Sequence, residues 1–369
     1  MKRILHLIDS TETGGAETVF LDLIRHLDRT KYTPVIVIPG KGWVYDQLLT
    51  NNFTPFVIPA KGSFNLRFLI ALIKLVRREK IDLIQAHLLG SNVYASLAGL
   101  LTRTPVIATF HGMVDVGVQE RFIWMKQLIL NLGSRRIVFV SHSLLKHLSQ
   151  RMRFVTTKCT IIYNGVDFDR FNNINRQQVR HLLGIKENEI CIISVGDIRE
   201  SKGHNILIDA ASRILCDHNN VKFVVAGDKS TTLGKKVIDA CNKLGLSDKI
   251  IFLGYRNDIP DLLVAADIFA LPSTKEGFSI ATIEAMGASI PVIVTRSGGP
   301  EEIVSNDNIG ILIPANNAKA LANAIDKLIR NPGIRKKMSE NALLHAMQTF
   351  SIKHMLNSYE RIYDSLLAK

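Results

Sequence analysis

The chain has 369 residues, more than one hydrophobic core usually supports, so we expect two domains. Hydrophobic residues make up 47% and charged residues 21% of the sequence, and Gly and Pro number 24 and 11. This composition excludes a disordered, collagen-like or coiled-coil protein.

The chain carries a net charge of +13, because 46 Lys and Arg residues outnumber 33 Asp and Glu residues. Such an excess suggests an anionic partner, which could be nucleic acid, acidic lipid or a phosphorylated substrate. Residues 1–165 hold 21 basic and 10 acidic side chains, whereas residues 166–369 hold 25 and 23. The first half is therefore expected to bind the anionic partner.

The cysteine pattern and the uncharged segments indicate a soluble, cytoplasmic protein. The cysteines are Cys159, Cys191, Cys216 and Cys241. Without a Cys-x-x-Cys pair they predict neither a zinc site nor a dense disulfide framework. The N-terminus lacks the hydrophobic region and cleavage site of a signal peptide. Residues 83–102 have the length of a membrane span but contain several polar residues, so we predict a strand, a loop and a helix there.

Short runs rich in Ile, Val and Phe alternate with helical stretches, as in parallel sheets covered by helices. In the first half, strands are expected at residues 3–8, 34–38, 56–58, 81–86, 106–109, 137–140 and 160–162. In the second half, they are expected at residues 190–195, 222–226, 250–253, 268–271, 292–294 and 311–313. Helices are expected at 18–27, 66–80 and 121–136, from about 204, and at 351–369. Each half is therefore predicted to be an α/β domain with its own doubly wound sheet.

Hydrophobic periodicity lapses at residues 164–178, which we interpret as the connection between a first domain at 1–165 and a second at 166–350. In open sheets of this kind, ligands bind beyond the carboxyl ends of the strands. If the two sheets face one another, the site would lie in a central cleft between them.

Two loops after predicted strands suit an anion. Gly14 and Gly15 precede a helix, where backbone N–H groups and the helix dipole favour a phosphate, although an ordinary strand-to-helix turn would also explain them. The Gly-x-Gly-x-x-Gly dinucleotide motif is absent there. Arg199 and Lys202 follow the strand at 190–195 and could neutralise a diphosphate leaving group, or be solvated loop charges.

Residues 272–286 carry the most informative pattern. Glu276 and Glu284 are eight residues apart, so one carboxylate is expected in a loop and the other along a helix. Gly277 allows a tight turn, and the amides of Phe278, Ser279 and Ile280 would point out of the helix start. A carboxylate beside such amides suits the hydroxyls of a sugar or ribose; the alternative is a capping acid and a surface helical Glu.

These segments resemble glycosyltransferase family 4, whose members are retaining enzymes of the GT-B fold. In order, the matching segments are Asn-Gly-Val-Asp at 164–167, Gly196 with Lys-Gly at 202–203, Ala-Gly-Asp at 226–228, Phe-Leu-Gly-Tyr at 252–255 with Asp258, Ala-Ala-Asp at 265–267, Glu276 to Glu284 with Ala-Met at 285–286, Pro-Val-Ile at 291–293, and Gly-Gly at 298–299 with Glu-Ile-Val at 302–304. The first half matches through Gly-Gly-Ala-Glu at 14–17, Phe-His-Gly at 110–112 and Val-Ser at 140–141. The whole set in this order is specific, although each piece is common.

The resemblance implies two Rossmann-like domains. The first would bind the acceptor and the second the nucleotide sugar, and the helix at 351–369 would cross back to the first. It implies these contacts with the donor: Glu276 with sugar hydroxyls, Glu284 with ribose, Lys202 with the diphosphate, the amides of Gly277, Phe278, Ser279 and Ile280 with sugar and phosphate, Gly14 and Gly15 with the phosphates, Tyr255 and Arg256 with the edge of the base, and His111 with the reacting sugar.

One residue departs from the family pattern, and one pair of residues resembles a motif of a different glycosyltransferase fold. Asp197 stands where the family usually has Arg, and Arg199 is the candidate to supply the missing charge. Asp167 and Asp169 imitate the Asp-x-Asp metal motif of a different glycosyltransferase fold, but they lie in the expected connection. We therefore expect metal-independent activity and no cofactor.

The function implied is retaining transfer of a sugar from a nucleotide-diphosphate donor to a hydroxyl of a lipid-linked or polysaccharide precursor. Residues 66–80 and 121–136 look like basic amphipathic helices, which suit the anionic inner face of the cell membrane; ordinary core-facing helices are the alternative. Binding to nucleic acid is not expected, because no known motif accompanies the basic residues. An epimerase, a phosphorylase and a non-catalytic sugar-nucleotide sensor remain alternatives.

Overall fold

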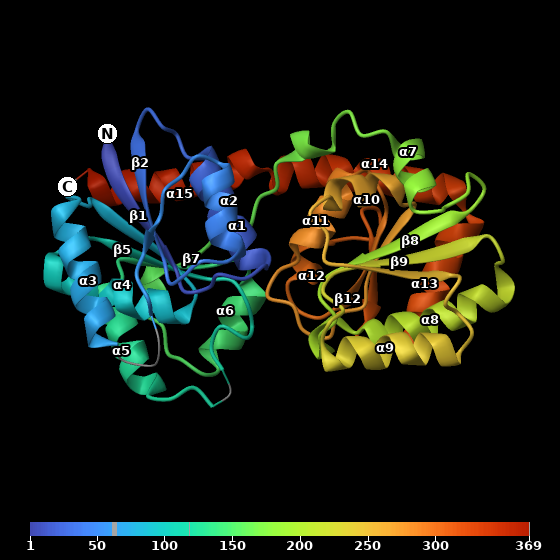
Figure 1. Cartoon of the computed structure of the whole chain (residues 1–369), viewed down its shortest axis with the longest axis horizontal. Coiled ribbons are helices and arrows are strands. Elements are labelled where there is room, and N and C mark those ends of the chain that lie inside the picture. The colour runs from blue at the N-terminus through green and yellow to red at the C-terminus, as the bar shows by residue number, and fades with distance from the viewer. Residues whose placement is uncertain (61–64, 118, 369) are drawn as a thin grey trace. The chain divides into compact units, whose positions relative to one another are not determined.

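The computed structural model describes residues 1–60, 65–117 and 119–368 and divides into two compact units (Figure 1). Unit 1 consists of Met1–Gly165 and the C-terminal segment that begins at Ile352, and unit 2 is Val166–Ser351. The expected boundary at 350 falls one residue too early, because Ser351 pairs with Val166, whose N–H donates to the Phe350 carbonyl at 2.9 Å.

Unit 1 is built on a parallel sheet with the strand order β3-β2-β1-β4-β5-β6-β7. Its strands are β1 (Lys2–Ile8), β2 (Tyr32–Ile38), β3 (Phe56–Val57), β4 (Leu83–His87), β5 (Val106–Phe110), β6 (Arg136–Phe139) and β7 (Cys159–Ile161). Its helices are α1 (Gly15–His26), α2 (Trp43–Thr50), α3 (Leu66–Arg78), α4 (Leu89–Thr102), α5 (Ile123–Gly133), α6 (His142–Ser149), the 3-10 turn η1 (Thr156–Lys158) and α15 (Ile352–Leu367).

Unit 2 is built on a second parallel sheet, with the order β10-β9-β8-β11-β12-β13. Its strands are β8 (Ile190–Val195), β9 (Val221–Ala226), β10 (Ile250–Gly254), β11 (Ile268–Leu271), β12 (Val292–Arg296) and β13 (Ile311–Pro314). Its helices are η2 (Phe168–Phe171), α7 (Arg176–Leu182), η3 (Glu200–Lys202), α8 (His204–Asp217), α9 (Thr232–Lys243), α10 (Ile259–Ala265), α11 (Ile280–Gly287), α12 (Pro300–Ile303), α13 (Ala318–Arg330) and α14 (Pro332–Thr349).

All thirteen expected strands are present, and those at 190–195 and 268–271 have the expected bounds. The helix bounds were less accurate. Helix α1 begins at Gly15, three residues before the expected start, because the Thr18 N–H already donates to the Gly14 carbonyl. Helix α5 is shorter than expected, since Phe122 before it is left-handed (φ 54°). Helix α3 ends before Lys80, which has φ 49°.

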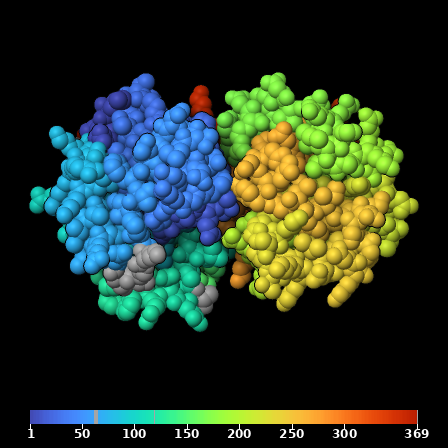
Figure 2. Space-filling view, in the orientation of Figure 1, coloured from blue at the N-terminus to red at the C-terminus, as the bar shows by residue number. Residues whose placement is uncertain are grey.

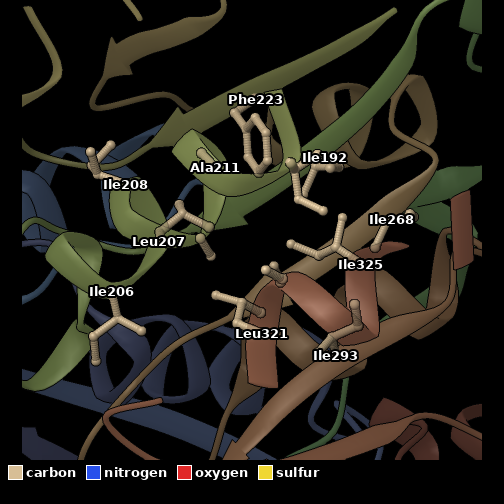
Figure 3. Packing of buried hydrophobic residues seen from close by; sticks show 14 of the residues in the cluster. Ile192, Ile206, Leu207, Ile208, Ala211, Phe223, Ile268, Ile293, Leu321 and Ile325 are labelled. Atoms are coloured by element: carbon tan, nitrogen blue, oxygen red, sulfur yellow. The ribbon is translucent and has the colours of Figure 1, made fainter. Parts of the chain in front are cut away.

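Alternate side chains of the strands point to opposite faces of each sheet. In unit 1, Leu5 and Leu7 pack with the apolar faces of α3 and α4, and Ile8 packs with α1 and α2. In unit 2, Ile192, Phe223 and Ile268 meet Leu207 of α8 and Leu321 of α13 in a continuous core (Figure 3). The space-filling view shows the yellow segment that contains α9 at the surface of unit 2, where the polar side of that helix is exposed (Figure 2).

Residues 83–102 form β4 and α4, as expected. Over the parts of the chain that the structure describes, none of the helices combines the length and the hydropathy that crossing a bilayer would need.

Helix α15 packs on unit 1, although it follows unit 2 in the sequence. The Tyr32 hydroxyl donates to Asp364 at 2.5 Å, and the Tyr32 and Tyr363 rings meet edge to face at 5.5 Å. Tyr359 and Tyr363 are fully buried. Helix α15 is therefore part of unit 1, which also contains the N-terminal residues.

Each sheet has one point where the strand order reverses, between β1 and β4 in unit 1 and between β8 and β11 in unit 2. Connections leave such a pair of strands toward opposite faces, so the two loops separate and leave a crevice at the carboxyl edge. Gly14 follows β1 and His87 ends β4, whereas Lys202 follows β8 and Glu276 follows β11. Most of the predicted site residues therefore lie at these two edges.

Candidate functional site

Two loops of unit 2, after β8 and after β11, are joined by their backbones. The Thr274 N–H donates to the Ser201 carbonyl at 2.7 Å. Gly203 has φ 65°, and a Cβ there would lie 2.1 Å from the Pro272 carbonyl oxygen. A larger residue at 203 would be strained and would also force the loops apart. This close approach brings the side chains of the two loops together.

Lys202 and Glu276 meet at this junction. The Lys202 Nζ donates to Glu276 Oε1 at 2.6 Å, and the Ser273 hydroxyl donates to the same oxygen at 2.7 Å. The Glu276 side chain is 9% exposed and the Lys202 side chain 28% exposed. Because both donors use Oε1, the second carboxylate oxygen can accept hydrogen bonds from a ligand. The sequence did not point to Ser273, since a serine after a strand carries no distinctive pattern.

A third loop holds the backbone of Glu276. The Glu276 N–H donates to the Ser297 carbonyl at 2.9 Å, and the Gly299 N–H donates to the Glu276 carbonyl at 3.0 Å. A Cβ at Gly299 would lie 2.5 Å from the Phe278 Cα, so only glycine allows this approach. The carboxylate is therefore fixed by its side chain and its backbone.

Helix α11 follows this loop, and Glu284 lies within it, so the expected loop and helix positions of the two acids are confirmed. The Ser279 hydroxyl accepts the Thr282 N–H at 3.3 Å and caps the helix. The Phe278 ring packs against Phe350 at 5.8 Å. Phe278 is buried, so its ring belongs to this packing contact.

Arg170 is the partner of Glu284. One guanidinium nitrogen lies 3.2 Å from Glu284 Oε1, and the Glu284 side chain is 10% exposed. Arg170 belongs to η2, in the segment that the sequence assigned to the connection. The pair is 114 residues apart in sequence, and no local pattern could have linked its members.

Arg199 and Asp197 form an ion pair at 3.1 Å in which the Arg199 side chain is 61% exposed. Asp197 also accepts the Asp228 N–H at 2.9 Å, which ties the end of β8 to the loop after β9. The charge of Arg199 is therefore partly balanced by Asp197, which stands where the family usually has the arginine that Arg199 was expected to replace. Lys202 is the cation that lies against Glu276.

Tyr255 and Arg256 follow β10, two strands away from β8 in the sheet. The Tyr255 hydroxyl donates to Asn257 at 2.7 Å, and Arg256 donates to Asp258 at 2.7 Å. The side-chain hydrogen bond to Asp258 raises the pKa of Arg256. Tyr255 and Arg256 are thus exposed after β10, the outermost strand of the sheet.

Asp167 and Asp169 have local structural partners. The Asp167 carboxylate accepts the Asp169 N–H at 3.1 Å and caps η2, and Asp169 accepts a hydrogen bond from the Asn172 side chain at 3.2 Å. Within residues 1–60, 65–117 and 119–368, no three His, Cys, Asp or Glu side chains are grouped so as to hold a metal ion.

In unit 1, Gly14 and Gly15 lie at the start of α1, as the expected anion site requires. Gly14 is extended (φ 177°), and α1 has no side-chain cap there. A Cβ at Gly14 would lie 2.4 Å from Glu17 Oε2. A carboxylate thus already occupies this helix start, where negative charge is stabilised.

His111 follows β5 and is 8% exposed. Its Nε2 lies 2.8 Å from Nδ1 of His87, at the end of β4. Burial lowers the pKa of His111 to about 3, so the ring is neutral at physiological pH. The sequence had singled out His111 alone, because His87 is distant in the chain.

An open cavity of about 350 Å³ lies beside this edge of unit 1, lined by Asp9, Leu88, Leu89, Gly90, Val114, Asp115, Glu120 and Lys126. Asp9 accepts the Ser91 N–H at 3.0 Å, and Asp115 accepts the His111 N–H at 2.7 Å. Burial raises the pKa of Asp9 to about 6 and that of Asp115 to about 7. The cavity is therefore acidic, although unit 1 is basic overall.

Helix α5 exposes an apolar stripe. The teal segment that contains this helix lies at the lower edge of unit 1 in the view of Figure 2. Trp124, Leu128 and Leu132 are spaced four residues apart and are 66%, 51% and 62% exposed. The polar side chains Gln127 and Asn131 instead accept the backbone N–H groups of Arg153 and Val155, at 2.6 and 3.0 Å. Besides the fully buried Leu130, polar groups thus help to hold the helix, and these three apolar groups remain in solvent.

Helix α3 behaves differently. Phe68, Leu72, Leu75 and Val76 are buried in the core of unit 1. The hypothesis that this apolar face meets a membrane is therefore wrong, because the sheet covers it. Leu66 and Ile70 are its exposed large apolar residues.

Comparisons with known proteins identify the family. The model of glycosyl transferases group 1 matches residues 175–345, and the model of Glycosyltransferase Family 4 matches residues 13–170. The chain is a family 4, group 1 glycosyltransferase. Its chemistry is therefore glycosyl transfer.

Several curated glycosyltransferases are similar over most of their length. An Escherichia coli protein named UDP-Gal:alpha-D-GlcNAc-diphosphoundecaprenol alpha-1,3-galactosyltransferase is 28% identical over 82% of this chain and 80% of its own. The Staphylococcus aureus capsular polysaccharide biosynthesis glycosyltransferase CapM is 24% identical over 92% of each chain.

Solved structures share the fold. Anabaena HepE in complex with UDP-glucose has a TM-score of 0.89 at 23% identity, over 99% of this chain and 100% of its own. WaaG, a glycosyltransferase involved in lipopolysaccharide biosynthesis, has a TM-score of 0.74 at 17% identity, over 99% of both chains. The two Rossmann-like units are those of the GT-B fold.

The buried Asp115 predicts a pH-dependent stability. Its raised pKa means that the folded chain keeps a proton that the unfolded chain releases near pH 3.8. Above that pH the free energy of unfolding of the wild type therefore falls as the pH rises, and this loss of stability is complete near pH 7. Asp115→Asn removes it, so the thermal stability of the variant relative to the wild type should rise between pH 4 and 7 and then level off. The exposed Asp46→Asn is the control, and a pH-independent difference for Asp115→Asn would contradict the prediction.

Proposed function

We propose that this glycosyltransferase moves a sugar from a nucleotide-diphosphate donor to an acceptor hydroxyl with retention at the anomeric carbon. The observation that carries the proposal is the cluster of Lys202, Glu276 and Ser273 at the reversal point of the unit 2 sheet. A cation, a carboxylate and a helix N-terminus within two adjoining loops match a ligand that combines phosphate with neutral hydroxyls.

In this proposal, Lys202 stabilises the negative charge that the diphosphate gains as the glycosidic bond breaks. Glu276 accepts hydrogen bonds from sugar hydroxyls through its second oxygen. The amides from Gly277 to Ile280 hold the sugar and phosphate. Arg199 contributes less than Lys202, because it is exposed and paired with Asp197.

Glu284 is proposed to bind the ribose hydroxyls, and Arg170 to hold the Glu284 carboxylate in place before the donor arrives. A buried acid needs a partner, and the guanidinium supplies one. Tyr255 and Arg256 border the base. In unit 1, Gly14 and Gly15 approach the phosphates, and His111 contacts the reacting sugar.

The relatives favour a lipid-linked or polysaccharide acceptor. The Escherichia coli relative is named for a UDP-Gal donor and a diphosphoundecaprenol-linked acceptor, and CapM for capsular polysaccharide. We extend this class of donor and acceptor to the present chain. Retention follows from the family resemblance, with the acceptor attacking on the face that the diphosphate leaves.

We further propose that the stripe of Trp124, Leu128 and Leu132 docks on the anionic face of a membrane. Three large apolar side chains in solvent favour burial in a lipid interface. Arg121, Arg135 and Arg153 near this stripe are exposed, and they suit anionic headgroups. Docking would hold the enzyme at the surface where a lipid-linked acceptor is found.

Glu276→Gln should lower kcat/KM by about a hundredfold or more, because an amide cannot replace the charge and both acceptor oxygens of the carboxylate. The measurement is nucleoside diphosphate release in a donor screen that includes UDP-galactose, with polyprenyl-diphosphate-linked sugars as acceptors. Exposed Glu340→Gln, far from the cluster in sequence, is the matched control. Near-normal turnover of a folded Glu276→Gln protein would refute the role of Glu276.

Chelation should leave activity unchanged, because Lys202 and backbone amides supply the positive charge in this proposal. The test compares initial rates in excess EDTA with rates in added Mg²⁺ or Mn²⁺. Loss of activity in EDTA that either metal restores would overturn the metal-independent mechanism.

Replacement of Trp124, Leu128 and Leu132 by Ser should lower the partition coefficient onto anionic vesicles by at least about tenfold, since three exposed apolar groups are lost. The measurement is flotation with vesicles of phosphatidylglycerol and phosphatidylcholine, and with phosphatidylcholine alone. Replacement of the exposed Ile334, Leu344 and Met347 of unit 2 by Ser is the matched control. Equal flotation of the stripe variant and wild type, or no binding of wild type to either vesicle, would exclude this docking.

A further inference from the structure

His87 and His111 form a buried pair at the carboxyl edge of the unit 1 sheet. His87 is the last residue of β4, and His111 directly follows β5, its neighbour in the sheet. The two rings stack with centroids 5.0 Å apart and planes inclined by 18°. Nδ1 of His87 lies 2.8 Å from Nε2 of His111, so the rings share one hydrogen bond.

Both rings are neutral. Burial lowers the pKa of His111 to about 3, and burial together with the neighbouring histidines lowers that of His87 well below its usual range. A neutral imidazole has one N–H and one bare nitrogen. One of the two facing nitrogens must therefore carry the shared proton, and the tautomer of each ring fixes that of the other.

The pair leaves one nitrogen of each ring without a partner among the described residues, Nδ1 of His111 and Nε2 of His87. His87 is fully buried, and the Phe20 ring of α1 meets it edge to face at 5.4 Å. His6 of β1 is also fully buried. His87 is therefore enclosed by the protein, whereas His111 keeps 8% of its surface accessible, with its Nδ1 buried and without a partner among the described residues.

We propose that His87 is a positioning residue that locks His111 in one ring orientation and one tautomer, so that Nδ1 is the nitrogen that His111 offers to the donor sugar. This inference rests on the proposed function for the contact of His111 with the sugar. A fixed tautomer gives that contact a defined donor or acceptor character, with no cost of selecting it on binding. If His87 only packed in the core, the tautomer of His111 would not depend on the hydrogen bond between the two rings.

Two variants of His87 separate the hydrogen bond from packing. His87→Asn keeps a polar group near the position of Nδ1, and His87→Leu fills similar space without one. If the lock operates, His111 in the wild type shows a single tautomer in long-range ¹⁵N spectra of histidine-labelled protein. His87→Leu should shift it toward the tautomer mixture of free imidazole, and His87→Asn should restore a single form. A mixture in the wild type, or an unchanged His111 in His87→Leu, would overturn the proposal.

Kinetics provide the second readout. His87→Leu should lower kcat by about tenfold to a hundredfold, as expected for a misplaced contact group, with a smaller change in donor KM. His87→Asn should stay within a few-fold of the wild type. An equal loss in both variants, with both folded, would assign His87 to packing and overturn the lock.

The His111→Ala variant separates the two hypotheses. Wild-type turnover in His111→Ala would refute the proposed role of His111 in transfer, whereas the tautomer measurement decides the lock without any substrate. Thermal unfolding of each variant shows whether it is folded. If His87→Leu does not fold, the wild-type spectrum and His87→Asn still decide the outcome.

Discussion

The junction of the β8 and β11 loops is the constraint on which the candidate site depends. Thr274 donates to Ser201 across it, and Gly203 lies where any Cβ would collide with the Pro272 carbonyl. Because the sheet order reverses between these strands, their loops would otherwise diverge. The contact brings the two loops together and places Lys202 against Glu276. A larger residue at 203 would therefore disturb the junction directly beside Lys202.

Three ion pairs stand at the candidate site of unit 2. Lys202 pairs with Glu276, Arg170 with Glu284, and Arg199 with Asp197. The first two pairs contain a nearly buried carboxylate, which would be costly to leave alone. A ligand with phosphate and hydroxyl groups can satisfy both members of such a pair separately, because phosphate suits the cation and hydroxyls suit the carboxylate. The free protein thus holds these opposite charges next to one another before any ligand binds.

In unit 1, most of the positive charge lies at the surface. The net positive charge of residues 1–165 lies mostly on exposed arginines and lysines, whereas the sheet edge holds neutral His111 and the partly protonated Asp115. The basic excess therefore does not describe the cavity at that edge, which is acidic. Helix α5 adds an exposed apolar stripe beside basic side chains.

The sequence alone determined the α/β class, all thirteen strands and the family, because strand runs and motif order are local properties that one chain displays in series. It also placed Glu276 in a loop and Glu284 in a helix. Only the tertiary structure decided that Arg170 meets Glu284 and that His87 meets His111, since each contact joins segments far apart in the chain. It likewise decided that the apolar face of α3 is buried while that of α5 is exposed. Amphipathic periodicity reports that a helix has an apolar side, but what covers that side depends on neighbours that are distant in sequence.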